Sequence, residues 1–259
     1  MIVKSAAPKT CPPSGRLDSK IACIGEAPAS NEISQQEPFV GDAGNRLNDM
    51  MVNAGVVRSG CYFDNVFPEQ VVKRTSTGNP MFFVRIVGGK KQYVKVYDSK
   101  YGFTTYGKNL VADLIERLQG TTANIIVAMG EVAVRALTKY VDVGVTKCRG
   151  SVVPCTSMPH RKVLCMIHPS ATRKNHLWRY HSIFDLRKAK KESQTPDFPP
   201  VLHNFIKEPT YDQVIQYLAK IIREKKTQAV DLELFNDEIS VFGIGDNKHG
   251  IVIPFLNRY

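Results

Sequence analysis

The sequence predicts an α/β fold, a three-layer sandwich in which helices cover both faces of a mostly parallel central sheet. Two observations predict it. A chain of 259 residues is long enough for one sizeable core plus a remainder. Short apolar runs also alternate with helical patterns up to about residue 190, and strands that alternate with helices form parallel sheets buried on both faces.

The first part of this pattern predicts two strands, a helix and a hairpin. The apolar runs 21–24 (IACI) and 61–67 (CYFDNVF) predict buried strands. Alternating apolar and polar residues over 82–97, on both sides of Gly88-Gly89, predict a hairpin that we interpret as an insertion. The helix between the two strands has an apolar face made of Leu47, Met50, Met51 and Ala54.

The second part predicts two further strands, each followed by a helix. The strands are 124–129 (NIIVAM) and 163–167 (VLCMI), and the latter leads into the tripeptide HPS and a basic helix near 176–190. A helix before the first of these strands turns inward Leu110, Val111, Leu114, Ile115 and Leu118. The helix after it turns inward Val132, Ala133, Ala136, Leu137 and Tyr140.

We expect a first domain over residues 1–191, a linker over 192–208 and part of a second domain over 209–259. The charged, proline-rich run KKESQTPDFPP is typical of a linker. After it come one helix, with apolar residues Val214, Ile215, Leu218, Ile221 and Ile222, and three strands, QAVDLEL, ISVFGIG and GIVIPF. Three strands and one helix cannot close a core, so we interpret the tail as the opening of a domain whose remainder is absent from this chain.

The formal net charge of +11 favours a polyanionic partner, nucleic acid first and an anionic membrane second. The charge is concentrated between Lys147 and Lys191, a segment that contains eleven Lys and Arg residues and a single carboxylate, Asp185. Histidines and aromatic residues are interleaved with them, and bases stack on such rings. The alternative is a solvated basic face that only keeps the protein soluble.

The amino terminus lacks the apolar segment of a signal peptide, and no apolar run approaches the roughly 18 residues of a membrane span. We therefore expect a soluble, cytoplasmic protein, located in the host cytoplasm if a phage encodes it. The cysteines are scattered without a C-x-x-C pair, which predicts reduced, mostly buried thiols and neither disulfides nor a zinc site. They are Cys11, Cys23, Cys61, Cys148, Cys155 and Cys165.

Polar clusters follow three of the predicted strands, where parallel sheets bind ligands. They are GEAP from Gly25, Asn65, and HPS from His168. Each cluster alone could have a purely structural role. GEAP could be a loop stiffened by proline, Asn65 a side chain that caps the backbone at the end of a strand, and His168 a residue at the start of a helix.

Together the clusters fit the removal or recognition of a nucleobase. The Asn65 amide can pair with a Watson–Crick edge while Phe39 stacks on the extruded base. Glu26 could position a water or stabilise an oxocarbenium-like sugar, and His168 could donate a hydrogen bond to the departing base. Gly25, Gly41 and Gly44 would let the backbone approach a ligand closely, with Ala27 beside the base. Candidate DNA contacts are Arg149, Arg161, Lys162, Ser170, Arg173 and Lys174.

Residues 21 to about 190 resemble the uracil-DNA glycosylase superfamily, most closely its family 4. GEAPASNE and PFVGDAG resemble that family's first motif, and the spacing between them is kept. DNV resembles the strand that carries the uracil-recognising residue, and HPS resembles the second motif. Two further matches are AMGEVAVRAL, which resembles a later segment of the family, and Arg149-Gly150, which resembles its R-G dipeptide. The resemblance implies that Glu26 is the catalytic carboxylate, Phe39 the base-stacking ring, Asn65 the uracil-recognising residue and His168 the second-motif histidine. It also implies that the loop after His168 enters DNA where the base has left.

The sequence departs from family 4 in its glycines and its cysteines. Ala29 occupies a position where the family has glycine, and Gln36 occupies a position where the family often has a second glycine. We therefore expect the pocket loop to be shifted or narrowed. Family 4 enzymes hold a four-iron four-sulfur cluster on four cysteines. Here Cys11 is what remains of the early pair, Glu69 takes the place of the third cysteine, and no cysteine lies between Cys61 and Cys148. We therefore expect no cluster, with the hairpin replacing the element that it braced.

The tail resembles the first strands of the 3′–5′ exonuclease domain of family A DNA polymerases, in which an Asp-x-Glu motif binds two metal ions. Asp231 and Glu233 lie two residues apart, so they share one face of a strand, as shared metal ligands must. The alternative is a strand with two carboxylates on its solvent face. Mg²⁺ or Mn²⁺ is expected only in a complete exonuclease domain.

Jointly these features predict the amino-terminal region of a phage-type DNA polymerase, with DNA and the remainder of the polymerase as partners. One hypothesis is an active monofunctional uracil-DNA glycosylase, because Glu26, Asn65 and His168 are in register. The other is a catalytically inactive module that binds DNA or senses uracil and tethers the polymerase to its template. The altered loop, the missing cysteines and the dense basic segment favour the second.

Overall fold

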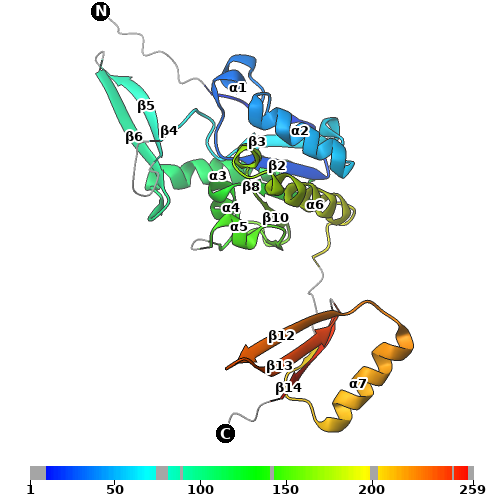
Figure 1. Cartoon of the computed structure of the whole chain (residues 1–259). Coiled ribbons are helices and arrows are strands. Elements are labelled where there is room, and N and C mark those ends of the chain that lie inside the picture. The colour runs from blue at the N-terminus through cyan, green and yellow to red at the C-terminus, as the bar shows by residue number, and fades with distance from the viewer. Residues whose placement is uncertain are drawn as a thin grey trace, which may run out of the picture. The chain divides into compact units, whose positions relative to one another are not determined.

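The computed structural model describes residues 10–73, 81–87, 90–140, 143–198, 204–246 and 248–255. The chain divides into two compact units, Met1–Phe198 and Pro199–Tyr259 (Figure 1). Among the described residues, none of the helices has the length and apolar character needed to cross a membrane.

The amino-terminal unit is built on a six-stranded sheet with the order β1-β3-β2-β8-β10-β9. The four central strands, β3 (Cys61–Asn65), β2 (Ile21–Gly25), β8 (Ile125–Met129) and β10 (Lys162–Met166), are parallel to one another. The edge strands β1 (Ser14–Gly15) and β9 (Val152–Pro154) are antiparallel. Every residue of the four central strands is buried, which confirms the predicted mostly parallel sheet.

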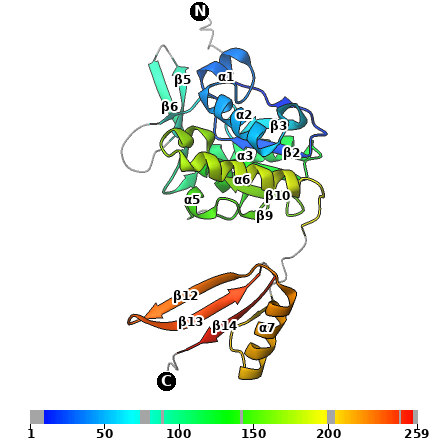
Figure 2. The same cartoon turned by 45° about the vertical axis from the view of Figure 1, so that its right-hand side comes forward.

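Helices cover both faces of this sheet, so the three-layer prediction is also confirmed. Because side chains alternate along a strand, Ile125 and Val127 pack in one core with α2 (Asp42–Ala54) and α6 (Leu177–Glu192). The intervening Ile126 and Ala128 pack in a second core with α3, α4 and α5. Those helices span Thr105–Gln119, Glu131–Leu137 and Val145–Cys148, and the shorter turns are α1 (Ser30–Gln35), η1 (Arg58–Gly60) and η2 (Pro169–Arg173) (Figure 2).

The predicted hairpin is present as strands β5 (Met81–Val87) and β6 (Lys90–Asp98), which pair antiparallel. Its predicted turn at Gly88-Gly89 lies outside the described residues. Strands β4 (Val72–Lys73) and β7 (Gly102–Phe103) extend it to a four-stranded sheet. Phe83 and Tyr97 are buried in the core with α3 and α4, so the hairpin is anchored to the amino-terminal unit.

The carboxy-terminal unit has one helix, α7 (Tyr211–Glu224), and a sheet of order β11-β14-β13-β12. Strands β12 (Ala229–Phe235), β13 (Glu238–Gly245) and β14 (His249–Pro254) match the three predicted strands. Strand β11 (Asn204–Ile206), which lies within the range 192–208 that we expected as a linker, pairs with β14 inside this sheet. All residues of β12 are exposed, and α7 contains no buried residue.

Candidate functional site

The order of the central strands brings the predicted site residues to one edge of the sheet. Asn65 is the last residue of β3, Glu26 follows β2, Gly130 follows β8 and His168 lies two residues beyond β10. Because the four strands are parallel and adjacent, their carboxyl ends meet at this edge. The three clusters predicted separately therefore lie on one edge, with Gly130 between Glu26 and His168.

Gly25 is the point where Asn65 and Phe39 meet. It is paired in register with Asn65. A Cβ atom on Gly25 would lie 2.5 Å from Asn65 Oδ1 and 2.6 Å from Phe39 Cζ, so only glycine fits. Phe39 is 2% exposed and takes a left-handed backbone conformation with φ of 60°. The Phe39 ring and the Asn65 carboxamide therefore both lie close to Gly25, at the carboxyl end of β2.

Glu32 holds the loop that carries Glu26 and Phe39. Its carboxylate is buried and accepts hydrogen bonds from the backbone N–H groups of Ala29 and Phe39. The first is an N-terminal cap of α1, and the second fixes the strained Phe39 backbone. The sequence analysis gave Glu32 no role, although it is the final Glu of the GEAPASNE motif.

The two departures from the family's glycine pattern are accommodated locally. Ala29 is extended, with φ of −90° and ψ of 178°, so its position does not require glycine. Gln36 is left-handed, with φ of 54°, and its side-chain amide donates to the carbonyls of Thr10 and Ile33, both at 2.7 Å. These bonds stabilise a conformation that glycine would adopt more easily.

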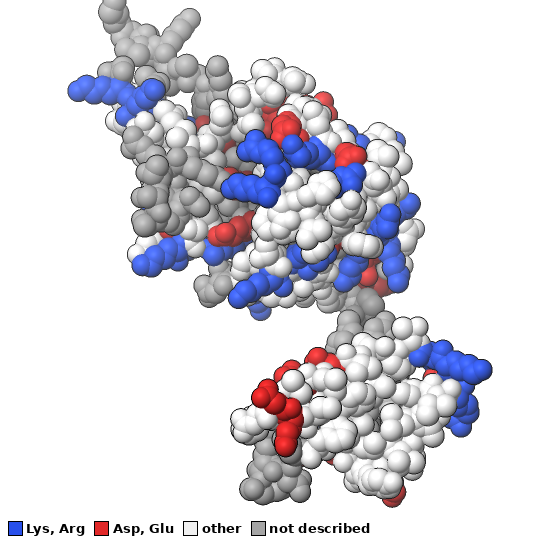
Figure 3. Space-filling view, viewed as in Figure 1, with Lys and Arg blue, Asp and Glu red and all other residues white. Residues whose placement is uncertain are grey.

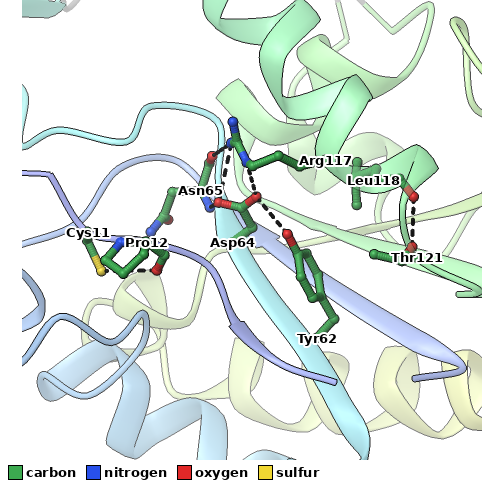
Figure 4. A network of polar contacts seen from close by, with 8 residues as sticks. All are labelled: Cys11, Pro12, Tyr62, Asp64, Asn65, Arg117, Leu118 and Thr121. Carbon is green, nitrogen blue, oxygen red and sulfur yellow. Dashed lines mark hydrogen bonds and ion pairs between the residues drawn. The ribbon is translucent and has the colours of Figure 1, made fainter. Parts of the chain in front are cut away.

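A buried network holds the end of β3, where Asn65 lies (Figure 4). Arg117 of α3 donates to Asp64 at 2.7 Å and to the Asn65 carbonyl at 3.3 Å. Asp64 accepts from the Asn65 N–H at 2.7 Å and from the Tyr62 hydroxyl at 3.2 Å. Burial, reinforced by the Asp64 charge, raises the pKa of Tyr62 above its ordinary value. The sequence analysis missed Arg117, because its partner is 53 residues away.

The His168 ring has a defined tautomer in its neutral form. The Ser170 backbone N–H donates to His168 Nδ1 at 3.3 Å, and Ser170 Oγ lies 2.8 Å from the same atom. An accepting Nδ1 places the proton of the neutral ring on Nε2, as hydrogen-bond donor. Gly130, with φ of 89°, allows this packing, since a Cβ there would lie 3.1 Å from His168 Cβ.

A second carboxylate, Glu131, follows Gly130 and was not predicted as a site residue. It accepts a hydrogen bond from the hydroxyl of Tyr97 at 2.8 Å and forms an ion pair with Arg135 at 3.2 Å. Burial and Glu131 raise the pKa of Tyr97, and the charge of Glu26 contributes in the same direction. The inserted hairpin therefore supplies Tyr97 as a partner of Glu131, directly after Gly130.

Three of the predicted DNA contacts have intramolecular partners instead. Arg149 makes a bidentate ion pair with buried Asp185. Arg161 donates to the carbonyls of Thr121 and Ala123. Lys162 is 1% exposed and donates to the Thr195 carbonyl at 2.8 Å. Arg161 and Lys162 also lie at the amino end of β10, opposite His168, so we do not propose these three residues as DNA contacts.

The basic residues that follow His168 are exposed. Arg173 and Lys174 lie at the end of η2, and Ser170 at its beginning is exposed as well. Elsewhere on the amino-terminal unit, Lys and Arg side chains are distributed over the face shown in Figure 3 rather than gathered in one patch. Arg173 and Lys174 are therefore candidate DNA contacts because they follow His168 at the carboxyl edge of the sheet, and not because of the overall number of charges.

The cysteines do not fit an iron–sulfur cluster. Cys23 neighbours Cys61 and Cys148 neighbours Cys165, and no described group of three or more His, Cys, Asp or Glu side chains could hold a metal ion. Burial and nearby carboxylates raise the pKa of Cys11 to about 11. Glu69, in the place of the third cysteine, is instead bound by Arg85 of β5 at 2.5 and 2.8 Å.

In the carboxy-terminal unit, Asp231 and Glu233 lie on β12 opposite Gly243 and Val241 of β13. Both are exposed and share one face of the strand. They supply two carboxylates, and within the part of the chain that the structure describes no third His, Cys, Asp or Glu joins them. Two such ligands alone do not make a two-metal site.

The fold and the edge define a class: an α/β protein whose ligand site lies at the carboxyl ends of parallel strands. The family model of the uracil DNA glycosylase superfamily matches residues 12–191. The chain therefore belongs to the uracil DNA glycosylase superfamily.

Curated relatives match the same region. A type-4 uracil-DNA glycosylase of Thermotoga maritima is 29% identical over 179 residues, which cover 68% of this chain and 79% of that protein. A type-4 uracil-DNA glycosylase of Archaeoglobus fulgidus is 25% identical over 161 residues, which cover 61% of this chain and 68% of that protein.

Proposed function

We propose that the amino-terminal unit is a monofunctional glycosylase that hydrolyses the N-glycosidic bond of uracil in DNA. The observation that carries this proposal is the placement of Asn65, Glu26 and His168 at one sheet edge, with Phe39 facing Asn65 across Gly25. The names of the two relatives support the choice of uracil as the base.

In this mechanism an extruded uracil lies against Phe39 and pairs with the Asn65 carboxamide, whose donor and acceptor match the base edge. The bond between the sugar and the base breaks with its electron pair leaving on the base. His168 Nε2–H donates to the uracil oxygen on which negative charge develops. Glu26 orients the attacking water, stabilises the oxocarbenium-like sugar and accepts the proton of the water.

The Asn65 side chain is held ready for this role. The hydrogen bonds described for Asn65 with Asp64 and Arg117 are made by its backbone. They fix the residue without occupying its carboxamide. Such preorganisation raises discrimination, because an incorrect base leaves buried polar groups unpaired.

The test is incubation of a uracil-containing oligonucleotide with wild type and with Glu26→Gln, followed by alkaline cleavage at abasic sites. We expect cleavage with wild type and a loss of at least about 100-fold for the variant. Glu37→Gln is the matched control, because Glu37 is an exposed carboxylate of the same loop. Absence of product from wild type would exclude the proposal, and equal rates for wild type and Glu26→Gln would exclude the mechanism.

The second candidate function is a module that binds uracil-containing DNA without cleaving it and tethers a polymerase to its template. The burial of Phe39 favours it, because the base must find space against a ring that is already enclosed. The same oligonucleotide distinguishes the two functions. The binding module predicts tighter binding to uracil than to thymine with no abasic product.

We also propose that the carboxy-terminal unit is part of a 3′–5′ exonuclease domain of a phage-type DNA polymerase. The shared face of Asp231 and Glu233 and the full exposure of β12 support this proposal. Because two carboxylates do not complete the metal site, we expect no degradation of DNA in Mg²⁺ or Mn²⁺. Degradation that Asp231→Asn abolishes would contradict that expectation.

A further inference from the structure

The outward face of α6 carries a stripe of large apolar side chains. Leu177 is 63% exposed, Tyr180 48% and Phe184 61%. They recur at intervals of three and four residues and therefore share one face of the helix. The opposite face buries Ile183, Leu186 and Ala189 against the sheet, so the stripe is not needed for the core. We call Leu177, Tyr180 and Phe184 the α6 stripe.

Positive groups accompany the rings of the α6 stripe. The Arg179 guanidinium lies 5.8 Å from the Tyr180 ring centroid, and that of Arg187 lies 5.7 Å from the Phe184 centroid. Arg179 is also ion-paired with Asp49 of α2, which offsets its charge, whereas Arg187 donates to the Asn53 carbonyl and keeps its charge. The His176 ring lies 5.6 Å from Tyr180.

The carboxylates of α6 do not offset this charge. Asp185 is buried and bound by Arg149, and Glu192 is paired with Lys162. Exposed Lys188, Lys190 and Lys191 extend the positive surface towards the end of the helix. A partner for the α6 stripe therefore has to combine flat apolar surface with negative charge.

We propose that the α6 stripe binds the single-stranded DNA that flanks the extruded base. Unpaired bases offer flat faces that stack on Tyr180 and Phe184, and their phosphates suit the neighbouring Arg and Lys side chains. Duplex DNA hides those faces in its own stack. A protein partner fits less well, because lysine is depleted at protein interfaces.

The position of the α6 stripe agrees with this partner. His168 is the N-cap of η2, and three residues separate the end of η2 from the start of α6, so Leu177 is the residue of the α6 stripe closest to His168 along the chain. Figure 2 shows α6 running across the front of the amino-terminal unit. From Leu177 to Phe184 the helix advances about 10 Å.

The test measures affinity for a thymine-only oligonucleotide, single-stranded and as a duplex, by fluorescence anisotropy. Binding to the strand does not require uracil excision; only the location of the strand beside an extruded base rests on the proposed function. We expect Tyr180→Ala/Phe184→Ala to weaken single-strand binding by about 25-fold or more, since each stacked base contributes at least about fivefold. We expect duplex binding to change by less than about twofold, because duplex contacts are to phosphates.

Two controls accompany this variant. Tyr101→Ala removes another exposed tyrosine, 75% exposed with Lys95 and Lys100 over its ring, and is expected to leave both affinities unchanged. Tyr180→Phe/Phe184→Tyr keeps both rings and is expected to bind like wild type.

Unchanged single-strand affinity, or an equal loss on strand and duplex, would overturn the proposal. An excision assay on the same proteins separates the two inferences. Excision with unchanged binding by the double alanine variant would leave the glycosylase and remove the strand site. Single-strand binding that depends on the α6 stripe, without excision of uracil, would support the strand site and exclude the glycosylase.

Discussion

At the scale of single residues, the geometry of the candidate site depends on small and buried groups as much as on its chemical side chains. Gly25 leaves the space in which Asn65 and Phe39 meet, and Glu32 ties the Phe39 backbone to the loop. Neither residue contributes chemistry to the proposed reaction. Both determine the positions of the groups that take part in the proposed reaction.

Gly25→Ala tests this directly. The added methyl group would have to displace the Asn65 carboxamide or the Phe39 ring, so we expect excision of uracil to fall more than about tenfold. Overpacking of this kind also destabilises, by about 1–3 kcal/mol. Gly60→Ala is the matched control, because a Cβ there meets no atom within 4 Å. A Gly25→Ala protein with normal excision rates would show that the pocket lies elsewhere.

At the scale of elements, two side-chain contacts are among the polar contacts that join the hairpin to the rest of the amino-terminal unit. One is the bond from Tyr97 of β6 to Glu131 at the start of α4. The other is the ion pair between Arg85 of β5 and Glu69, next to the segment that carries Cys11. The hairpin thus contacts Glu131, which directly follows Gly130, and Glu69, which lies beside the segment that carries Cys11.

The raised pKa of Tyr97 predicts a loss of stability at alkaline pH. The unfolded chain releases the phenolic proton near its ordinary pKa of about 10, whereas the folded protein retains it. As pH rises above about 10, the unfolded state is therefore favoured. We expect the unfolding free energy of wild type to fall more steeply than that of Tyr97→Phe, by up to about 1.4 kcal/mol per pH unit.

Urea unfolding at several pH values between about 9 and 11 measures this difference. Tyr101→Phe, which changes an exposed ring, should follow the wild-type curve. Parallel curves for wild type and Tyr97→Phe would contradict the prediction.

Because Glu69 is paired with Arg85, we expect the folded protein to be stable without an iron–sulfur cluster. We expect the purified protein to contain no iron and to show no cluster absorbance. Glu69→Gln leaves Arg85 in a partly buried place without its carboxylate. Breaking a buried pair costs about 3–5 kcal/mol, and solvent screening here reduces that to about 1–3 kcal/mol.

Asp18→Asn is the control for this variant, because the pair of Arg16 with Asp18 is exposed and is expected to have little effect. A brown preparation with bound iron would refute the interpretation of the cysteines. An unchanged urea midpoint for Glu69→Gln would refute the bracing role of the ion pair.

At the scale of the whole molecule, the net charge of +11 describes the partner only in general terms. Several of the cations in the basic segment hold the fold together, as Arg149, Arg161 and Lys162 do. The salt dependence of DNA binding should therefore reflect fewer residues than the composition suggests.

We expect a steep fall of single-strand affinity with salt, to which Arg173 and Lys174 contribute. Removing both in Arg173→Ala/Lys174→Ala should lower the slope of log affinity against log salt by about 1.4, since each phosphate contact contributes about 0.7. Lys20→Ala is the control, because Lys20 is exposed at the opposite end of the sheet. An unchanged slope in the double variant would remove these two residues from the DNA face.

The sequence by itself determined the class of fold, the hairpin and the candidate residues Glu26, Asn65 and His168. These follow from local signals, namely apolar periodicity and short motifs at strand ends. Only the tertiary structure decided which basic side chains have intramolecular partners, and that Arg117 bonds to Asp64 and Asn65 while Tyr97 bonds to Glu131. Those roles depend on contacts between residues far apart in the chain, such as the 53 residues between Asp64 and Arg117, and no local pattern encodes such contacts.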